Sequence, residues 1–360
     1  MEPVRISCIG DFLPADTAYT MGNGIGSSIA DLIKYYSGND NNPFHNSDIT
    51  FCNLEAPLIT NPDMVNLPFA GNPAIIQLMK VLNISVVSVA NNHMHDHGLE
   101  GFEQTINILE ENGFLQIGLE SDRISRIAWL ECKGLKFAFA AFNAINDHPG
   151  NKFIATLERE ILFRTMEEIK KRSPDYTIFS IHWGNEYVTS PSPSQVDLAH
   201  ELIDNGVNVI IGHHPHVVQP IEKYHGGIIL YSLGNFLFDM FWSEKVRNGM
   251  QVDLLFNEDR QIGYQIKPYR IKSDFTPDYT KTKIVLSILS NAGKTHELLQ
   301  ARSREAYQKV YSHECKKQRL QARMQMKLHL LMNICTLSPQ SRKLFFRNIA
   351  KKSGFLWKNN

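Results

Sequence analysis

The sequence predicts an α/β fold, and two observations lead to this prediction. Short apolar runs rich in β-branched residues alternate with segments of helical periodicity, as strands and helices do in α/β domains. Most of these runs end in Asp, Glu, Asn or His, and α/β proteins bind ligands at the carboxyl ends of their strands. The predicted fold therefore indicates where functional residues should gather.

Six strands are predicted, each followed by polar residues. They are residues 4–9, 49–52, 84–90, 176–181, 207–211 and 227–230. The runs at 84–90 and 207–211 are apolar throughout, as in central strands that are covered on both faces. Four further strands form two predicted hairpins, 128–132 with 135–142 and 250–256 with 261–271. Because hairpins pair antiparallel, the sheets should be mixed.

Helices are predicted between the strands from periodicity and end signals. Residues 73–82 follow Asn72, a good N-cap, and residues 99–112 stop before Gly113, a residue type common just after a helix. The other two predicted helices are residues 157–171 and 194–205.

Charge is distributed unevenly along the 360 residues, although the formal net charge is zero. From residue 294 onwards, 15 Lys and Arg accompany only three acids. A neutral chain made of an acidic body and a basic tail suggests two segments with different partners. We therefore predict one domain at 1–275 and a basic helical extension at 276–360.

Cysteine usage and the N-terminal residues predict the compartment. The five cysteines are scattered and show no CxxC spacing, which favours reduced thiols over a disulfide framework or a zinc ribbon. No secretory signal or membrane span is recognised. A cytoplasmic protein is therefore expected.

Seven of the 14 histidines lie in three segments at predicted strand ends. They are His93, His95 and His97, then His182, then His213, His214 and His216. Imidazole, carboxylate and amide oxygen bind zinc, manganese or iron, and none of these segments contains a thiol. Side chains two residues apart on a strand share a side, which suits His214 and His216.

Each residue alone has an ordinary structural explanation. Asp11 fits a turn or a helix cap, Asn91-Asn92 fits a turn, and His182 beside Trp183 fits a packed core. Three histidines within four positions are harder to explain structurally. The joint pattern therefore predicts a site for one or two divalent metal ions.

Six motifs follow one another in the sequence: GD at 10–11, NLEAP at 53–57, NNHMHDHG at 91–98, HWGNEY at 182–187, GHHPHVVQPIE at 212–222 and YSLGNFLFD at 231–239. In this order they resemble the motifs of the CapA family of capsule and poly-γ-glutamate synthesis proteins, which is related in fold to the calcineurin-like metallophosphoesterases. The resemblance covers about residues 4–245. It implies a metallophosphoesterase-like sandwich of two mixed β-sheets flanked by helices, with the site at the strand ends.

Carried over by position, the resemblance implies six metal ligands: Asp11, Glu55, Asn92, His182, His214 and His216. It places His93 beside the substrate and His213 at a variable position. Leu13 stands where metallophosphoesterases have a histidine, so one ion and two ions both remain open. Capsule-assembly members usually carry an N-terminal membrane anchor, which is not recognised here.

If the site is catalytic, three further residues have roles. His93 would protonate the leaving group, and Asp96 would orient His93 or a ligand histidine. Glu186 would contact substrate or act as a general base, and its alternative is an exposed surface acid. The expected function is a phosphoester-type hydrolase of capsule or poly-γ-glutamate synthesis, acting on an anionic polymer or a phosphorylated small molecule. The alternative is a non-catalytic, metal- and polymer-binding accessory subunit of a synthesis or export complex.

The basic tail is predicted to form a long helix at about 295–333 and a second basic amphipathic segment at 342–352. One interpretation is a helix packed on the acidic body. Another is peripheral membrane contact through basic residues and apolar anchors, namely Leu344, Phe345, Phe346, Phe355 and Trp357. Nucleic acid is not an expected partner, because no nucleic-acid module precedes the tail.

Overall fold

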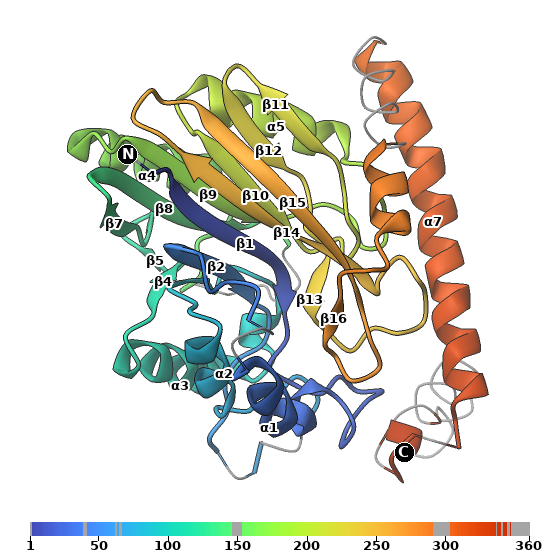
Figure 1. Cartoon of the computed structure of the whole chain (residues 1–360). Coiled ribbons are helices and arrows are strands. Elements are labelled where there is room, and N and C mark those ends of the chain that lie inside the picture. The colour runs from blue at the N-terminus through green and yellow to red at the C-terminus, as the bar shows by residue number, and fades with distance from the viewer. Residues whose placement is uncertain are drawn as a thin grey trace.

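Two mixed β-sheets form the centre of the molecule (Figure 1). The computed structural model describes residues 2–38, 42–61, 63–64, 67–145, 153–290, 303–335, 337–339, 341–343 and 346. The first sheet has the order β16-β15-β14-β1-β2-β3-β4 with β13 beside β1, and the second has the order β11-β12-β10-β9-β8-β7. The predicted α/β class with mixed sheets is confirmed.

The strands of the first sheet are β1 (Val4–Phe12), β2 (Ile49–Leu54), β3 (Val86–Ser88), β4 (Leu115–Ile117), β13 (Asn235–Leu237), β14 (Asn248–Phe256), β15 (Ile262–Ile271) and β16 (Pro277–Asp278). Those of the second are β7 (Ala128–Cys132), β8 (Leu135–Asn143), β9 (Tyr176–His182), β10 (Val209–His213), β11 (Ile221–Tyr224) and β12 (Gly227–Leu230). A small separate hairpin joins β5 (Glu120–Ser121) and β6 (Ile124–Ser125). Both predicted hairpins, β7–β8 and β14–β15, are present.

Parallel pairing brings the polar strand ends together. β1, β2, β3 and β4 are parallel, and Asp11 pairs with Asn53 on β2. In the second sheet β8, β9, β10 and β12 are parallel, and His182 pairs with His213. Because the carboxyl ends of parallel strands meet at one edge, each sheet presents a row of polar side chains there.

The two sheets pack face to face through aromatic and branched side chains. Phe137 on β8 and Tyr176 on β9 contact Phe256 on β14, with ring centroids 5.2 and 4.6 Å away. All three belong to the largest hydrophobic cluster, which also contains residues of β1 and β2. This shared core fixes the distance between the two rows of strand ends.

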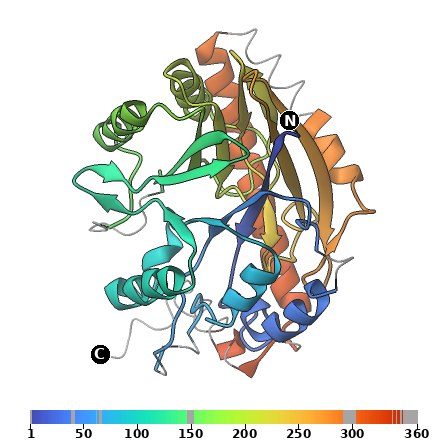
Figure 2. The same cartoon turned by 60° about the vertical axis from the view of Figure 1, so that its left-hand side comes forward.

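Helices cover the outer faces of the sheets (Figures 1 and 2). The helices are α1 (Ile25–Tyr36), α2 (Ile75–Val81), α3 (Gly98–Glu111), α4 (Arg159–Arg172), α5 (Pro193–Asp204) and α7 (Arg304–Met332). The first three contribute to the cluster around the first sheet, and α4, α5 and α7 contribute to the cluster on the second. α7 runs along one side of the molecule, and none of the described helices is long and apolar enough to cross a bilayer.

Element boundaries shift slightly from the predicted ones. α2 begins at Ile75, because Asn72 accepts a hydrogen bond from the Ala74 N–H in a turn before the helix. α5 begins as predicted after a proline-rich stretch, and Ser192 and Gln195 cap each other reciprocally. Much of the predicted segment 342–352 and residues 295–302 lie outside the described residues.

Candidate metal centre

Asp11 and Glu55 are the two carboxylates at the centre of the strand-end cluster. Asp11 lies near the end of β1, and Glu55 follows β2 directly. Together with His182 they offer ligand atoms that all lie within 4.8 Å of one another. All three side chains are essentially inaccessible to solvent. Their sequence positions are far apart, so only the two-sheet packing brings them together.

His182 and Asn92 point toward one another across the two sheets. His182 Nε2 lies 2.9 Å from Asn92 Oδ1, and the Asn53 amide lies 3.4 Å from the other ring nitrogen. Two ligand atoms at about 2.1 Å from one cation, at a right angle, are about 3 Å apart. The observed separation therefore suits two neighbouring ligands of one ion.

His216 is held in the tautomer that a metal ligand needs. Its Nδ1 lies 3.0 Å from Asn235 Oδ1, and the Asn235 amide donates to the Val246 carbonyl. The Asn235 oxygen therefore accepts, so Nδ1 carries the proton and Nε2 presents its lone pair. That Nε2 lies 3.5 Å from Glu55 Oε1, an atom with no hydrogen-bond partner among the described residues.

His213 and His214 also enter the cluster. His213 Nδ1 lies 2.8 Å from Asp11 Oδ1, and the His214 backbone N–H donates to Asp11 Oδ2 at 3.3 Å. His214 and His216 have φ angles of 92° and 54°, and both follow the end of β10. The predicted reason for their proximity, alternation along a strand, is therefore wrong. A strained turn brings them together instead, with ring centroids 5.9 Å apart.

The cluster holds negative charge in a buried place. Burial raises the pKa of Asp11, but hydrogen bonds from His213 and His216 outweigh it and leave that pKa well below its usual value. Burial and the neighbouring Asp11 carboxylate raise the pKa of Glu55 well above its usual value. A second ionised carboxylate here therefore requires a compensating positive charge.

The remaining imidazoles supply neutral ligands. Burial, followed by the charge of a neighbouring histidine, lowers the pKa of His182 well below 6.5 and that of His214 to about 3. Imidazole nitrogens and two carboxylates, with one Glu55 oxygen lacking a donor among the described residues, are donors that zinc, manganese and iron ions bind. The residues present therefore fit a divalent metal ion.

His93 lies beside the cluster but differs from the ligands in exposure. Its side chain is 23% exposed, whereas those of His182 and His216 are 1% exposed. Asp96 Oδ2 lies 2.8 Å from His93 Nδ1, and the ring stacks on Phe69 with centroids 4.5 Å apart. The carboxylate and the aromatic ring fix the imidazole while leaving one edge accessible to a substrate.

The sequence leaves open whether Glu186 is a site residue or a surface acid, and whether a second ion could bind beside Leu13. Burial and Asp11 raise the pKa of Glu55 most, and the charge of the nearby Glu186 adds to this rise. The Glu186 residue is partly exposed. Leu13 is fully buried in an apolar cluster with Val217 and Phe238. The position where a second ion would find an imidazole is therefore apolar.

The loop after β9 is held by α7. Asn185 donates to the Tyr311 hydroxyl at 2.8 Å, and the Thr189 N–H donates to Gln318 Oε1 at 3.2 Å. Arg319 Nη1 donates to Asn185 Oδ1 at 3.5 Å. Sequence reasoning missed Arg319 because it lies 80 residues beyond the last motif, which ends at Asp239. Asn235 and His213 stand within motifs, but nothing in their type or spacing reveals their hydrogen bonds.

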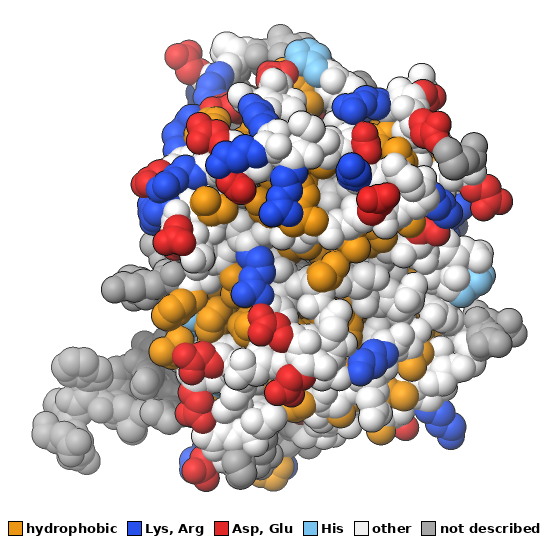
Figure 3. Space-filling view, turned by 90° about the vertical axis from the view of Figure 1, so that its left-hand side faces the viewer, with side chains coloured by type: hydrophobic (Ala, Val, Ile, Leu, Met, Phe, Trp, Pro, Cys, Tyr) orange, Lys and Arg blue, Asp and Glu red, His pale blue; other side chains and the backbone are white. Residues whose placement is uncertain are grey.

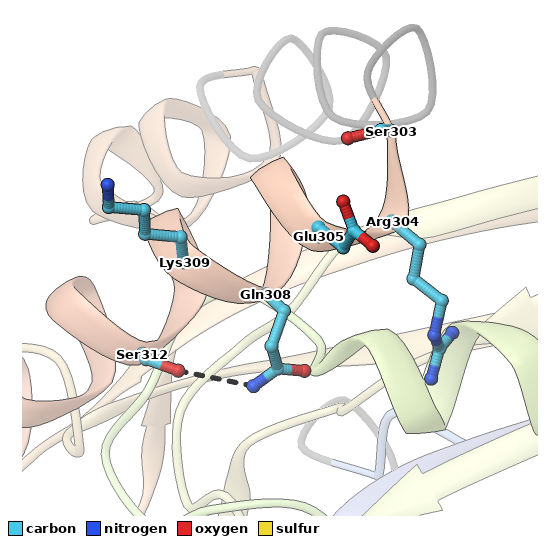
Figure 4. A pocket seen from close by; sticks show the side chains of 6 residues that line it. All are labelled: Ser303, Arg304, Glu305, Gln308, Lys309 and Ser312. Atoms are coloured by element: carbon cyan, nitrogen blue, oxygen red, sulfur yellow. Dashed lines mark hydrogen bonds between the residues drawn. The ribbon is translucent and has the colours of Figure 1, made fainter.

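A separate surface hollow at the start of α7 is unrelated to this cluster. Figure 4 shows its six lining residues, all from one stretch of the chain, Ser303 to Ser312, with Gln308 donating to Ser312 at 3.1 Å. None of the predicted site residues lines it. The hollow therefore adds nothing to the strand-end cluster as the candidate site.

Similar proteins include capsule and poly-glutamate synthesis proteins. The chain is 30% identical over 217 residues to the capsule biosynthesis protein CapA of Bacillus anthracis, covering 55% of this chain and 52% of that protein. It is 29% identical over 243 residues to the PGA biosynthesis protein CapA of Bacillus subtilis, covering 63% of each. It is 27% identical over 216 residues to a probable polyglutamine synthesis accessory protein of Mycobacterium tuberculosis, covering 54% of this chain and 56% of that protein. The matches thus span about half to just under two thirds of these relatives.

Among solved structures, a phosphatase from Mycoplasma pneumoniae has a TM-score of 0.48 at 12% identity, covering 78% of this chain and 97% of that one. A 5′-nucleotidase from Candida albicans has a TM-score of 0.44 at 10% identity, covering 89% and 58%. Residues 5–240 match the family described as bacterial capsule synthesis protein PGA_cap. Since this match covers about two thirds of the sequence and includes every proposed ligand, the chain belongs to the PGA_cap family.

Proposed function

We propose that the chain is a metal-dependent hydrolase of phosphoester type that acts on an anionic substrate in capsule or poly-γ-glutamate synthesis. The observation that carries this proposal is the difference in exposure between the buried proposed ligands and the neighbouring His93. Asp11, Glu55 and His182 are inaccessible, whereas His93 is partly exposed and paired with Asp96. A purely structural metal site has no need of such a neighbour.

The residues would share the chemistry as follows. When bound, a divalent cation supplies Lewis-acid activation of water and of a phosphoryl or carbonyl oxygen. Asp11, Glu55, Asn92, His182, His214 and His216 would hold the cation. Asp96 would orient the His93 ring through its contact with Nδ1, so that Nε2 can pass a proton to the leaving oxygen. Glu186, which is partly exposed, would accept a proton from water or contact substrate.

Relatives support the biological setting of this proposal. The names of the two Bacillus proteins refer to capsule and PGA biosynthesis. A substrate rich in carboxylates or phosphates is the kind of molecule that a hard or borderline cation binds.

Metal content and turnover test the proposal together. The purified chain is loaded with manganese, zinc or iron, its metal is quantified, and hydrolysis of phosphomonoesters, phosphodiesters and poly-γ-glutamate is measured. His216→Ala should lose metal and activity. His93→Ala should keep metal and lose about 100-fold in kcat. His225→Ala, an exposed histidine, is the matched control.

The alternative is a metal- and polymer-binding accessory subunit without turnover. The name of the Mycobacterium tuberculosis relative, a probable polyglutamine synthesis accessory protein, supports this alternative. Stoichiometric metal and binding of poly-γ-glutamate, with no hydrolysis of any of these substrates, would contradict the hydrolase proposal and support this alternative.

A further inference from the structure

Arg319 is a basic side chain of the C-terminal helix that reaches the rim of the metal centre. It lies on α7, outside the part of the chain that matches the family. Its guanidinium donates to Asn185, which follows the ligand His182 by three residues. The same loop carries Tyr187, whose backbone N–H donates to the Pro215 carbonyl at 2.8 Å and whose ring centroid lies 6.5 Å from that of His216. The helix therefore adds a positive charge to a site built from strand ends.

This guanidinium has unused capacity for hydrogen bonding. Arginine carries five N–H donors, and the contact with Asn185 uses one. Within the described part of the chain, no carboxylate lies within the 4.0 Å of an ion pair to Arg319. The side chain is only partly buried, so its remaining donors can meet a ligand.

Neighbouring contacts hold the helix firmly in this position. Gln318, the preceding residue, accepts from Thr189 and from Lys245 at 3.2 and 3.3 Å. Tyr307 is 5% exposed and donates to the Pro191 carbonyl at 2.9 Å. An arginine held by these contacts, with no acidic partner in the described part of the chain, is suited to recognising an oxyanion.

We propose that Arg319 binds an anionic group of the substrate, a phosphate or carboxylate oxygen, beside the metal centre. The inference rests on the proposed function, because it places the substrate next to the cation. It makes α7 part of the binding site and restricts the substrate to molecules that carry negative charge close to the scissile bond.

Binding of inorganic phosphate to the manganese-loaded full chain tests this inference by calorimetry, with metal content and turnover measured in parallel. Arg319→Ala and Arg319→Gln should each weaken phosphate binding about tenfold without loss of metal. The Gln variant loses the positive charge but keeps a hydrogen-bond donor for Asn185. Comparing it with the Ala variant therefore separates the effect of the charge from the effect of the hydrogen bond to Asn185. Arg323→Ala, an exposed arginine on the same helix, is the control and should bind like the wild type.

Two outcomes would overturn the inference. One is phosphate binding by both Arg319 variants that equals the wild type at equal metal content. The other is no phosphate binding by the metal-loaded wild type. Weaker phosphate binding in a chain without any turnover would instead support Arg319 while contradicting the hydrolase proposal, so the two failures are distinguishable.

The opposite face of α7 carries an independent feature, a stripe of exposed apolar side chains. Its members are Leu320, Met324, Leu328, Leu331 and Met332, with exposed fractions of 61, 62, 58, 56 and 75%. Spacings of four, four and three residues place the first four on one side of the helix. Five adjacent exposed Leu and Met side chains on one helix are unusual for a surface that faces only water.

Basic residues border this stripe. They are Lys316, Lys317, Arg323 and Lys327, all exposed. By contrast, the face in Figure 3 mixes positive and negative side chains among apolar ones. A second copy of the chain would bring like charges together at the stripe, whereas an anionic lipid surface would complement them.

We infer that the apolar stripe of α7 docks on an anionic membrane surface. Co-sedimentation with vesicles of phosphatidylglycerol and phosphatidylcholine tests this. The wild type should bind the mixed vesicles and not pure phosphatidylcholine. Met324→Glu with Leu328→Glu should reduce binding at least tenfold, while Leu99→Glu, an exposed leucine on α3, should not. Unchanged binding by the double variant would overturn the inference, as would vesicle-independent dimers that the same variant abolishes.

Discussion

Asp96 is proposed to orient His93 and not to bind the metal ion. It lies 2.8 Å from His93 Nδ1, and both side chains are about one-fifth exposed. In Asp96→Asn the carboxylate that orients His93 is lost, so kcat should fall about tenfold while metal content stays constant. Steady-state kinetics on the best phosphoester substrate measure this. Glu100→Gln on α3 is the control, and an unchanged kcat in Asp96→Asn would contradict the proposed role.

Asp239 gives the chain a pH-dependent stability. It is 3% exposed, and burial raises its pKa to about 6, although hydrogen bonds from Thr20 and Thr17 oppose the rise. Because the folded pKa exceeds the unfolded value of 3.8, the stabilising contribution is complete below that value and is lost as pH rises through about 6.

Replacing Asp239 should therefore flatten this dependence. Between pH 5 and pH 8 the wild type should lose about 1 kcal/mol of unfolding free energy from this group. Asp239→Asn should lack that loss, as measured by urea denaturation at both pH values. Asp31→Asn, an exposed acid on α1, should retain the wild-type difference. Equal pH dependence in Asp239→Asn and wild type would refute the assignment.

Residue types and order predict much of the site, and hydrogen bonds explain what they miss. The gathering of Asp11, Glu55 and His182 was predictable because polar residues end the apolar runs, whereas the full set of six ligands remains a prediction from the family resemblance. His213, predicted as variable, contacts Asp11, and Asn235 fixes the ring of His216. Such contacts depend on side-chain directions after the strands, which spacing does not encode.

At the level of elements, Gly10 lets β1 approach β13 closely. A Cβ at this position would lie 2.0 Å from the Gly234 carbonyl oxygen. Gly10→Ala should therefore displace β1 and with it Asp11, costing about 3 kcal/mol of unfolding free energy and weakening metal binding. Gly263→Ala on β15, whose nearest neighbour would be 3.5 Å away, should cost less than about 1 kcal/mol. Thermal and urea unfolding measure the stability of both variants. Equal losses would show that the close contact between β1 and β13 tolerates a side chain at position 10.

Most elements were predictable, and the exceptions have local causes. The long apolar runs all became strands, because buried β-branched residues leave few alternatives. α1 is absent from the predicted elements, since Gly22, Gly24 and Gly26 surround its start and no side chain caps it. The short strands β13 and β16 are defined by their neighbours rather than by their own sequences.

For the whole molecule, Tyr311 joins the C-terminal helix to the body. It is 6% exposed in the cluster on the second sheet and accepts a hydrogen bond from Asn185. Tyr311→Ala should cost about 3 kcal/mol of unfolding free energy and weaken phosphate binding, because Arg319 loses its frame. Tyr311→Phe should cost only about 1 kcal/mol. Urea denaturation measures both, and no loss in Tyr311→Ala would mean that α7 is dispensable for stability.

The predicted division of the chain into a domain and an extension at residue 275 remains a prediction.

Three proposed ligands, Asp11, Glu55 and Asn92, follow strands of the first sheet, and three, His182, His214 and His216, belong to the second. A cation held by both sets would join two layers that pack through apolar side chains and already share hydrogen bonds at their strand ends, such as the one between His213 and Asp11. Shearing one layer over the other would have to break coordination bonds. When the free metal concentration is 100 times the dissociation constant of the metal, metal binding adds about 2.7 kcal/mol to the unfolding free energy. Metal supply would then govern how long the protein survives in the cell as well as what it can do.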